Sequence, residues 1–74
     1  MSKPKLQLGV YQHYKGNRYL VLAEAKHSET LELMVVYVSL YENNESQVWV
    51  RPLNMFLSTV EVDGTIQPRF KYIG

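Results

Sequence analysis

The run LELMVVYVSLY at residues 31–41 constrains the fold more than any other feature of the chain. It is the longest β-branched run in the sequence, and β-branched and aromatic residues favour strands. It therefore predicts a strand over Leu33–Leu40. A chain of 74 residues forms one domain with a modest core, so the other elements are expected to be short.

Turn residues and alternating polarity divide the rest of the chain into further short strands. Gly16 and Asn17 tolerate the positive φ that a two-residue hairpin turn needs. Pro52 ends a strand because it cannot donate to a ladder, and Leu53–Leu57 has the length of a single helical turn. The predicted strands are Gly9–Tyr14, Tyr19–Ala25 (apolar enough for burial on both faces), Leu33–Leu40, Gln47–Arg51 and Ser58–Val62, followed by a turn at Asp63-Gly64 and a short extended segment over Pro68–Tyr72.

This pattern predicts a mainly β fold. We expect a small SH3-like antiparallel β-barrel of five or six short strands, with one short helical or 3₁₀ turn near residues 52–57. A strongly bent sheet is the alternative. The barrel is expected to form a single domain over residues 8–74. Residues 1–7 are polar and interrupted by Pro4, and they are expected to be flexible.

The composition excludes several kinds of site. The absence of cysteine removes disulfides, cysteine–zinc sites and thiol chemistry, and it fits a reducing compartment. No signal peptide and no membrane-spanning run is recognisable, so we expect a cytoplasmic protein. The formal charge is +1, from eight Lys and Arg against seven Asp and Glu without a basic block, so the composition gives no extra weight to nucleic-acid binding.

The quartet HSET at residues 27–30 raises the question of a reactive site. His27 and Glu29 are two residues apart, so in an extended segment both side chains point the same way and could share acid–base work. His13 is expected at the opposite end of the first hairpin, which disfavours a metal site that uses both histidines. We expect no metal and no cofactor. The quartet also suits a tight strand connection, in which polar side chains bond free backbone amides.

Aromatic residues suggest a binding surface. Six tyrosines, two phenylalanines and one tryptophan are many for so small a core, so some are expected at the surface. If Val48 and Val50 fill the core, Trp49 and Arg51 lie on the open face, where they could stack a planar ligand or hold a carboxylate. In the alternative, Trp49 covers the open end of the barrel and Arg51 forms a salt bridge with a glutamate.

Five motifs in their order along the chain resemble a known family. The motifs are GVYQHYKGNRY, KHSET, MVVYVSLY, WVRPLNMF and PRF, and on them the chain is identified as a member of the bacterial domain of unknown function 1653 family from Leu8 to Tyr72. The resemblance implies a small, mostly single-domain bacterial cytoplasmic protein with no established activity and no assigned catalytic residue. Relatives often have a glycine where this chain has Glu42, so the polar loop that follows is expected to vary.

The function predicted from the sequence is a non-enzymatic binding module for a peptide, protein or small-molecule partner, with a nucleic-acid partner not favoured. Its candidate ligand-binding side chains are Tyr11, His13, His27, Glu29, Trp49 and Arg51. An RNA-binding module is the first alternative, and it expects one basic patch formed by Lys15, Arg18, Arg51, Arg69 and Lys71. The second alternative is a small hydrolase or metal-dependent enzyme, which expects a deep pocket around His27 and Glu29. The sequence selects no oligomeric state.

Overall fold

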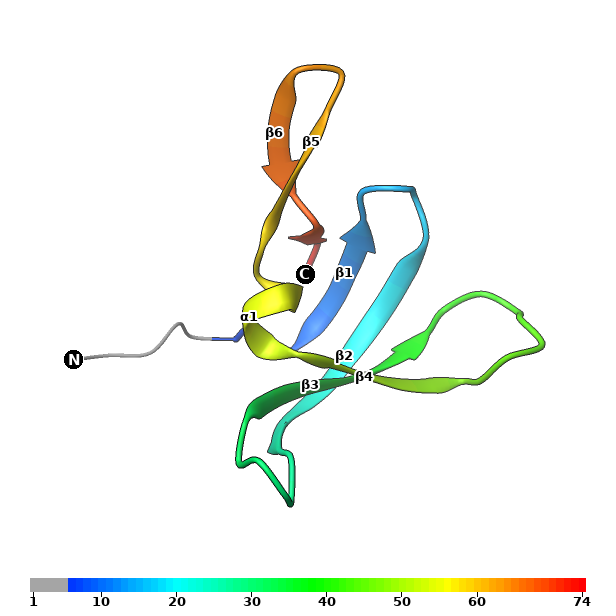
Figure 1. Ribbon diagram of the computed structural model, residues 1–74. Helices are drawn as coiled ribbons and strands as arrows, with labels where there is room; N and C mark the ends of the chain where they lie inside the picture. The colour runs from blue at the N-terminus through cyan, green and yellow to red at the C-terminus, as the bar shows by residue number, and fades with distance from the viewer. Residues whose placement is uncertain (1–5) are drawn as a thin grey trace.

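The computed structural model describes residues 6–74, which form a mainly β structure (Figure 1). The elements are β1 (Gly9–His13), β2 (Arg18–Lys26), β3 (Leu33–Ser39), β4 (Val48–Pro52), α1 (Leu53–Phe56), β5 (Thr59–Val62), β6 (Thr65–Pro68) and β7 (Phe70–Tyr72). The β class and the single helical turn after Pro52 were predicted correctly. Residues 1–5 of the segment expected to be flexible lie outside the described residues, and Leu6 packs against the core.

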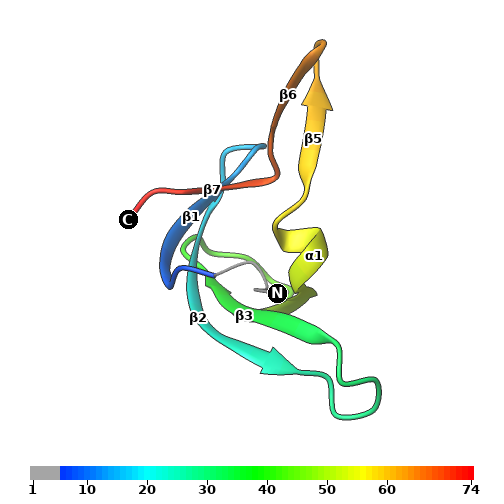
Figure 2. The ribbon, with the colours of Figure 1, turned by 90° about the vertical axis from the view of Figure 1, so that its left-hand side faces the viewer.

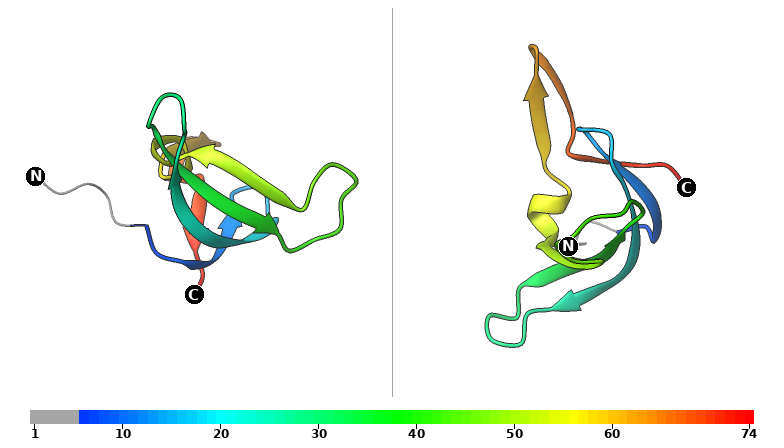
Figure 3. Two further views of the ribbon diagram at one scale, coloured as in Figure 1. Left: turned by 90° about the horizontal axis from the view of Figure 1, so that it is seen from below. Right: turned by 90° about the vertical axis from the view of Figure 1, so that its right-hand side faces the viewer.

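Five of the strands form one antiparallel sheet in the order β4-β3-β2-β1-β7. β1 and β2 form the predicted hairpin, in which Tyr11 pairs with Tyr19, and β3 pairs with β2 on one side and β4 on the other. A bulge between Val21 and Ala23 shifts the register of β2 against β3. Figures 2 and 3 show that this sheet curves around α1.

The predicted SH3-like closure is not found. β4 and β7 are the two edges of the five-stranded sheet, and no strand within residues 6–74 joins them into a closed barrel. The reason lies after α1, where β5 and β6 pair with each other as a separate two-stranded sheet that projects from the body (Figure 1). Asp63 and Gly64 have φ values of 52° and 80°, the left-handed conformations that a tight hairpin turn requires. This hairpin also adds one strand to the number expected.

The core fills the concave side of the sheet. Phe56 of α1 is fully buried, and its ring stacks on that of Phe70 with centroids 4.1 Å apart. Leu53, one turn earlier, is also buried, so the four-residue helix packs two side chains into the core on the concave side of the sheet. The buried apolar side chains are Tyr11, Val21, Val35, Tyr37, Leu53, Phe56 and Phe70.

The opposite, convex side of the sheet carries no covering element from the described residues. β2 was expected to be buried on both faces, but Val21 is its only buried residue, and Leu22 and Ala23 are exposed. Figure 2 shows why, since α1 and the β5–β6 hairpin both lie on the concave side. The expectation of a two-sided burial was therefore wrong for this chain.

Candidate functional site

HSET forms the connection between β2 and β3. Nδ1 of His27 accepts hydrogen bonds from the backbone N–H groups of Glu29 (3.1 Å) and Thr30 (3.3 Å). The hydroxyl of Thr30 accepts the N–H of Glu32 at 3.2 Å, and the His27 N–H donates to the carbonyl of Glu32 at 2.8 Å. These bonds satisfy backbone donors that the turn leaves without ladder partners. The geometry thus supports the strand-connection interpretation of the quartet.

The same geometry is unfavourable for acid–base chemistry at this loop. His27 and Glu29 are both exposed, and the hydrogen bonds to Nδ1 place the proton of the neutral ring on Nε2. A neutral His27 can therefore donate at Nε2 but has no free ring nitrogen to act as a base. Within residues 6–74, no group of three histidine or carboxylate side chains could share a metal ion.

His13 repeats this arrangement at the other end of β2. Its Nδ1 accepts the backbone N–H of Lys15 at 3.2 Å, and its carbonyl accepts the N–H of Gly16 at 2.7 Å. The turn is longer than the two-residue turn predicted, because His13 N–H bonds the carbonyl of Asn17 and only Gly16, at φ 111°, takes a positive φ. The two histidines lie at opposite ends of the hairpin, as expected.

Phe70 is the centre of a cluster that does contain predicted site residues. The ring of His13 meets that of Phe70 edge-on at 4.8 Å between centroids, and the Arg51 guanidinium carbon lies 5.3 Å from the same centroid. Tyr19 and Tyr37 approach the ring at 5.8 Å and 5.9 Å. The cluster thus joins β1, β2, β3, β4 and β7 at one end of the concave side. We call His13, Tyr19, Tyr37, Arg51 and Phe70 the Phe70 cluster.

Arg51 brings a cation to this cluster. Its Nε donates to the Tyr37 hydroxyl at 3.3 Å, and within residues 6–74 it forms no ion pair. The salt bridge to a glutamate considered from the sequence is thus not formed there. The His13 pKa is lowered from 6.5, first by burial and then by the positive charges of Arg51, Lys15 and Arg69. In the Phe70 cluster, the half-buried side chains of His13 and Arg51 thus lie against the buried ring of Phe70.

Tyr19 connects the Phe70 cluster to Tyr41 in the loop after β3. Its hydroxyl lies 3.0 Å from that of Tyr41, and the two rings meet edge-on. Burial and the bond to Tyr41 raise the Tyr19 pKa from 10.0 to about 12. Tyr19 is therefore neutral at physiological pH and presents a hydroxyl rather than an anion beside Arg51.

Two other predicted site residues lie on the core side of the sheet. Tyr11 is buried, and its hydroxyl donates to the carbonyl of Gln7 at 2.7 Å. Trp49 packs partly buried against the core, whereas Val48 and Val50 are exposed. The sequence correctly placed Trp49 and Arg51 on one face, but this face is the inner one. The indole Nε1 of Trp49 is buried without an acceptor among the described residues.

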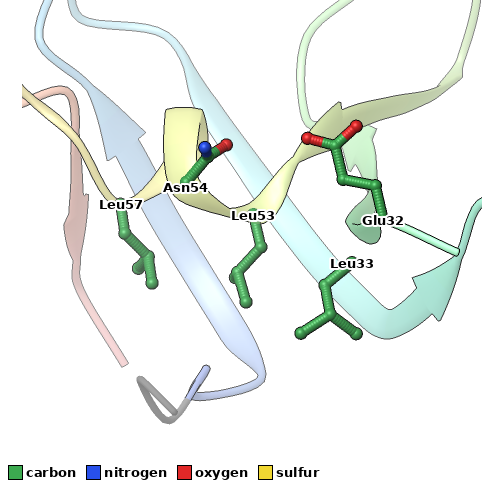
Figure 4. A pocket seen from close by; sticks show the side chains of 5 residues that line it. All are labelled: Glu32, Leu33, Leu53, Asn54 and Leu57. Atoms are coloured by element: carbon green, nitrogen blue, oxygen red, sulfur yellow. The ribbon is translucent and has the colours of Figure 1, made fainter. Parts of the chain in front are cut away.

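Two hollows lie on the surface formed by residues 6–74. One, of about 460 Å³, lies beside α1 and is lined by Glu32, Leu33, Leu53, Asn54 and Leu57. In Figure 4 the three leucines point to one side, and the polar ends of Glu32 and Asn54 point away from them. The other, of about 160 Å³, is lined by His13, Tyr14, Lys71 and three neighbours. Neither hollow is lined by His27 or Glu29.

Phe70, Tyr37 and Tyr19 were not among the six candidate residues from the sequence. Phe70 belongs to a closing segment whose pairing with β1 could not be assigned from its three residues, and that pairing, His13 opposite Phe70, builds the cluster. A signal was present in PRFKY, where cations alternate with aromatic residues. His27 and Glu29, by contrast, lie at the far end of β2 and take no part in the cluster.

Comparisons with known proteins agree with the motifs. Residues 9–72 match the family model described as "Protein of unknown function (DUF1653)". The crystal structure of a DUF1653 protein from Bordetella bronchiseptica superposes with a TM-score of 0.90 at 42% sequence identity, covering 93% of this chain and 88% of that one. A search of curated proteins finds no match. Among residues 6–74, no helix has the length and apolar character needed to cross a membrane.

Proposed function

This chain belongs to the DUF1653 family, and we propose that it is a non-enzymatic binding module whose ligand is an anionic group held at the Phe70 cluster. The observation that carries the proposal is the position of Arg51. Its guanidinium lies over the Phe70 ring, and its Nε donates a hydrogen bond to the Tyr37 hydroxyl.

The arrangement suits a carboxylate better than a neutral ligand. A guanidinium presents five N–H donors in a plane, and here the Tyr37 hydroxyl is the one acceptor among the described residues. His13 adds a second donor, because its neutral ring carries the proton on Nε2. Tyr19 is half-buried and offers a ring edge to a planar group attached to the anion, whereas the buried Phe70 ring supports the guanidinium of Arg51.

Matched aromatic probes test this proposal. Benzoate and benzamidine share a ring and differ in the sign of their charge. Titration of isotopically labelled protein by NMR is expected to show benzoate shifting the Arg51 Nε–H and His13 signals, with no comparable response to benzamidine. Arg51→Gln abolishes the benzoate response, whereas Arg18→Gln, at an exposed arginine outside the cluster, preserves it. Equal responses to both probes, or a response that survives Arg51→Gln, would contradict the proposal.

Nucleic-acid binding is a second candidate function. The net charge gave it no weight, but several basic side chains lie near one another in the structure. Lys15, Arg51 and Arg69 all act on His13, and Lys71 lines the hollow that contains His13. Phosphate-dominated binding weakens steeply with salt, by about a thousandfold or more between 50 and 200 mM for a protein with many phosphate contacts. Titration with an oligouridylate at both salt concentrations separates this function from benzoate-type recognition. Absence of binding at low salt would rule it out.

We also propose a cytoplasmic location for this binding module. The sequence contains no cysteine, so its stability is independent of the redox state of the compartment. Cell fractionation with an antibody against the chain tests the location, and recovery with the membrane or the external medium would contradict it.

A further inference from the structure

The smaller of the two hollows lies where the projecting β5–β6 hairpin meets β1 and β7 (Figure 1). It has a volume of about 160 Å³, and its lining comes from β1, the turn that follows β1, β6 and β7. Among residues 6–74 the lining residues are Gln12, His13, Tyr14, Gln67, Pro68 and Lys71, which we call the hairpin hollow. No aspartate or glutamate is among these six residues, and Lys71 brings a positive charge to them.

The bend between β6 and β7 holds the walls of the hairpin hollow in place. Arg69 lies at this bend. Its backbone N–H donates to the carbonyl of Ser58 at 2.9 Å, and its own carbonyl accepts the N–H of Tyr14 at 2.9 Å. The Nε of Arg69 also donates to the Ser58 hydroxyl at 3.0 Å. The hairpin is thereby fixed to the end of β1, so a ligand meets walls that are already in position, which lowers the cost of binding.

The lining residues offer hydrogen-bond donors from three strands. Gln12 and Lys71 pair across β1 and β7, so their side chains share a face of the sheet. Nε2 of Gln12 donates to the carbonyl of Gly16 at 3.2 Å, which orients the amide and leaves its second hydrogen. Gln67 adds an amide from β6. Donors on separate strands around one ammonium suit an anion whose oxygens point in several directions, whereas a planar carboxylate suits the fork of an arginine.

Further cations lie near the hairpin hollow. The Nζ atom of Lys15 lies 5.8 Å from the centroid of the Tyr14 ring. The pKa of His13 is lowered first by burial and then by the positive charges of Arg51, Lys15 and Arg69. These charges therefore act on a residue that lines the hollow. A concave surface surrounded by charges of one sign raises the local concentration of ions of the opposite sign.

We propose that the hairpin hollow is an anion-binding subsite that takes the terminal phosphate of a phosphate monoester. Its size supports a single group, because a water molecule occupies about 30 Å³ in the liquid and the hollow of about 160 Å³ holds about five such volumes. Pockets for whole drug-sized ligands measure about 300–1,000 Å³. The phosphate therefore enters the hollow, and the rest of the ligand stays outside it.

The hollow suits a monoester better than a diester. A phosphate monoester carries a charge of about −1.5 to −2 at pH 7 and has only one substituent. A phosphodiester, as in a nucleic-acid backbone, carries a single charge and continues on two sides. The walls formed by β1, β6 and β7 leave space for a group that ends inside the hollow.

This subsite goes beyond the function proposed above and does not depend on it. Lys71 and Phe70 are neighbours on β7, so their side chains lie on opposite faces of the strand. The ammonium of Lys71 and the guanidinium of Arg51, which lies over the Phe70 ring, therefore serve different sides of the sheet. His13 is the residue that the hairpin hollow and the Phe70 cluster share.

Titration with inorganic phosphate tests the subsite, followed by NMR of labelled protein at constant ionic strength with chloride as the balancing anion. We expect saturable shifts of the Gln12 and Gln67 side-chain amide signals. Lys71→Gln, at an exposed position, should weaken binding about tenfold or more, the fold-change for losing one hydrogen bond to a charged group. Lys26→Gln is the matched control at an exposed lysine at the far end of β2, and it should bind phosphate like the parent. Shifts that do not saturate, or that persist unchanged in Lys71→Gln, overturn the proposal.

Methyl phosphate and dimethyl phosphate test the preference for a monoester. Methyl phosphate should shift the same signals as inorganic phosphate, and dimethyl phosphate should bind severalfold more weakly. Equal binding of the two esters overturns the monoester preference and favours the nucleic-acid candidate instead.

Two variants separate this proposal from the one on the Phe70 cluster. Arg51→Gln should lose the benzoate response and still be saturated by phosphate, and Lys71→Gln should show the reverse. Loss of the phosphate response in Arg51→Gln would place the phosphate at the Phe70 cluster and overturn the separate subsite.

Discussion

Nδ1 of His27 lies 3.1 Å from the backbone nitrogen of Glu29 and accepts its hydrogen. The bond runs two residues forward along the chain, as an aspartate or asparagine side chain would do in an Asx-turn. His13 makes the same contact with Lys15 at 3.2 Å. Both histidines thus act as turn residues at opposite ends of β2, although their residue type first suggested chemistry.

His27→Ala is expected to lower the free energy of unfolding by about 1 kcal/mol, the net value of a typical hydrogen bond. In a domain of this size, that corresponds to a fall in Tm of roughly 4–8 °C. His27→Asn should recover most of the loss, because its side-chain oxygen can accept the same N–H. Glu29→Ala is the control, since the contact uses only the backbone of Glu29. Thermal unfolding followed by circular dichroism measures all three, and a His27→Ala variant as stable as the parent would contradict the role.

His13 is expected to make the fold sensitive to acid. Burial, followed by the charges of Arg51, Lys15 and Arg69, lowers its folded pKa below 6.5. The unfolded chain then binds a proton at a higher pH than the folded chain does. The contribution of neutral His13 to stability is therefore complete above pH 6.5, and it is lost as pH falls through the depressed folded pKa.

Arg51→Gln should raise the His13 pKa toward 6.5, because it removes the second of the causes that depress it. NMR titration of the His13 Cε1–H signal measures this pKa. Arg18→Gln serves as the control, since Arg18 is not among the charges that act on His13. An unchanged pKa in Arg51→Gln would show that the guanidinium does not face His13.

Tyr19 is expected to lose its proton at a higher pH than an ordinary tyrosine. Burial and the hydrogen bond with Tyr41 raise its folded pKa from 10.0 to about 12. Between these values the unfolded chain loses a proton that the folded chain keeps, so stability falls as pH rises above 10.0. Tyr41→Phe should lower the Tyr19 pKa, and ultraviolet titration of tyrosinate, with a Tyr19→Phe variant to assign the late step, detects the change. A late step that persists in Tyr19→Phe would belong to another tyrosine.

The local elements were predictable because their signals are local. Pro52 ends β4 and precedes α1, and Asp63-Gly64 forms the expected hairpin turn, since both effects depend on the backbone of one or two residues. Closure into a barrel depends instead on which distant strands pair. β5 pairs with its neighbour β6 rather than with the open edge of the larger sheet, and alternation of residues does not encode that choice.

The site was predictable only in part for the same reason. His13 and Arg51 were named from their strands, and they meet because β7 pairs with β1 and sets Phe70 opposite His13. The orientation of Trp49 was left open between an outward position, with Val48 and Val50 in the core, and a covering position; in the structure the two valines are exposed and Trp49 packs against the core. A strand that is apolar on both faces gives no signal of which face is covered.

Among the substitutions considered, we expect the largest loss of stability from Phe56→Ala in α1. Phe56 is fully buried and stacks on Phe70, so Phe56→Ala removes a large side chain and leaves a cavity between the helix and the sheet. Substitutions of this kind cost about 3–5 kcal/mol, a large part of the 5–15 kcal/mol available to a typical domain. Met55→Ala, at the neighbouring exposed position of the same helix, should change stability little. Urea unfolding measures both, and similar midpoints for the two variants would show that α1 does not anchor the core.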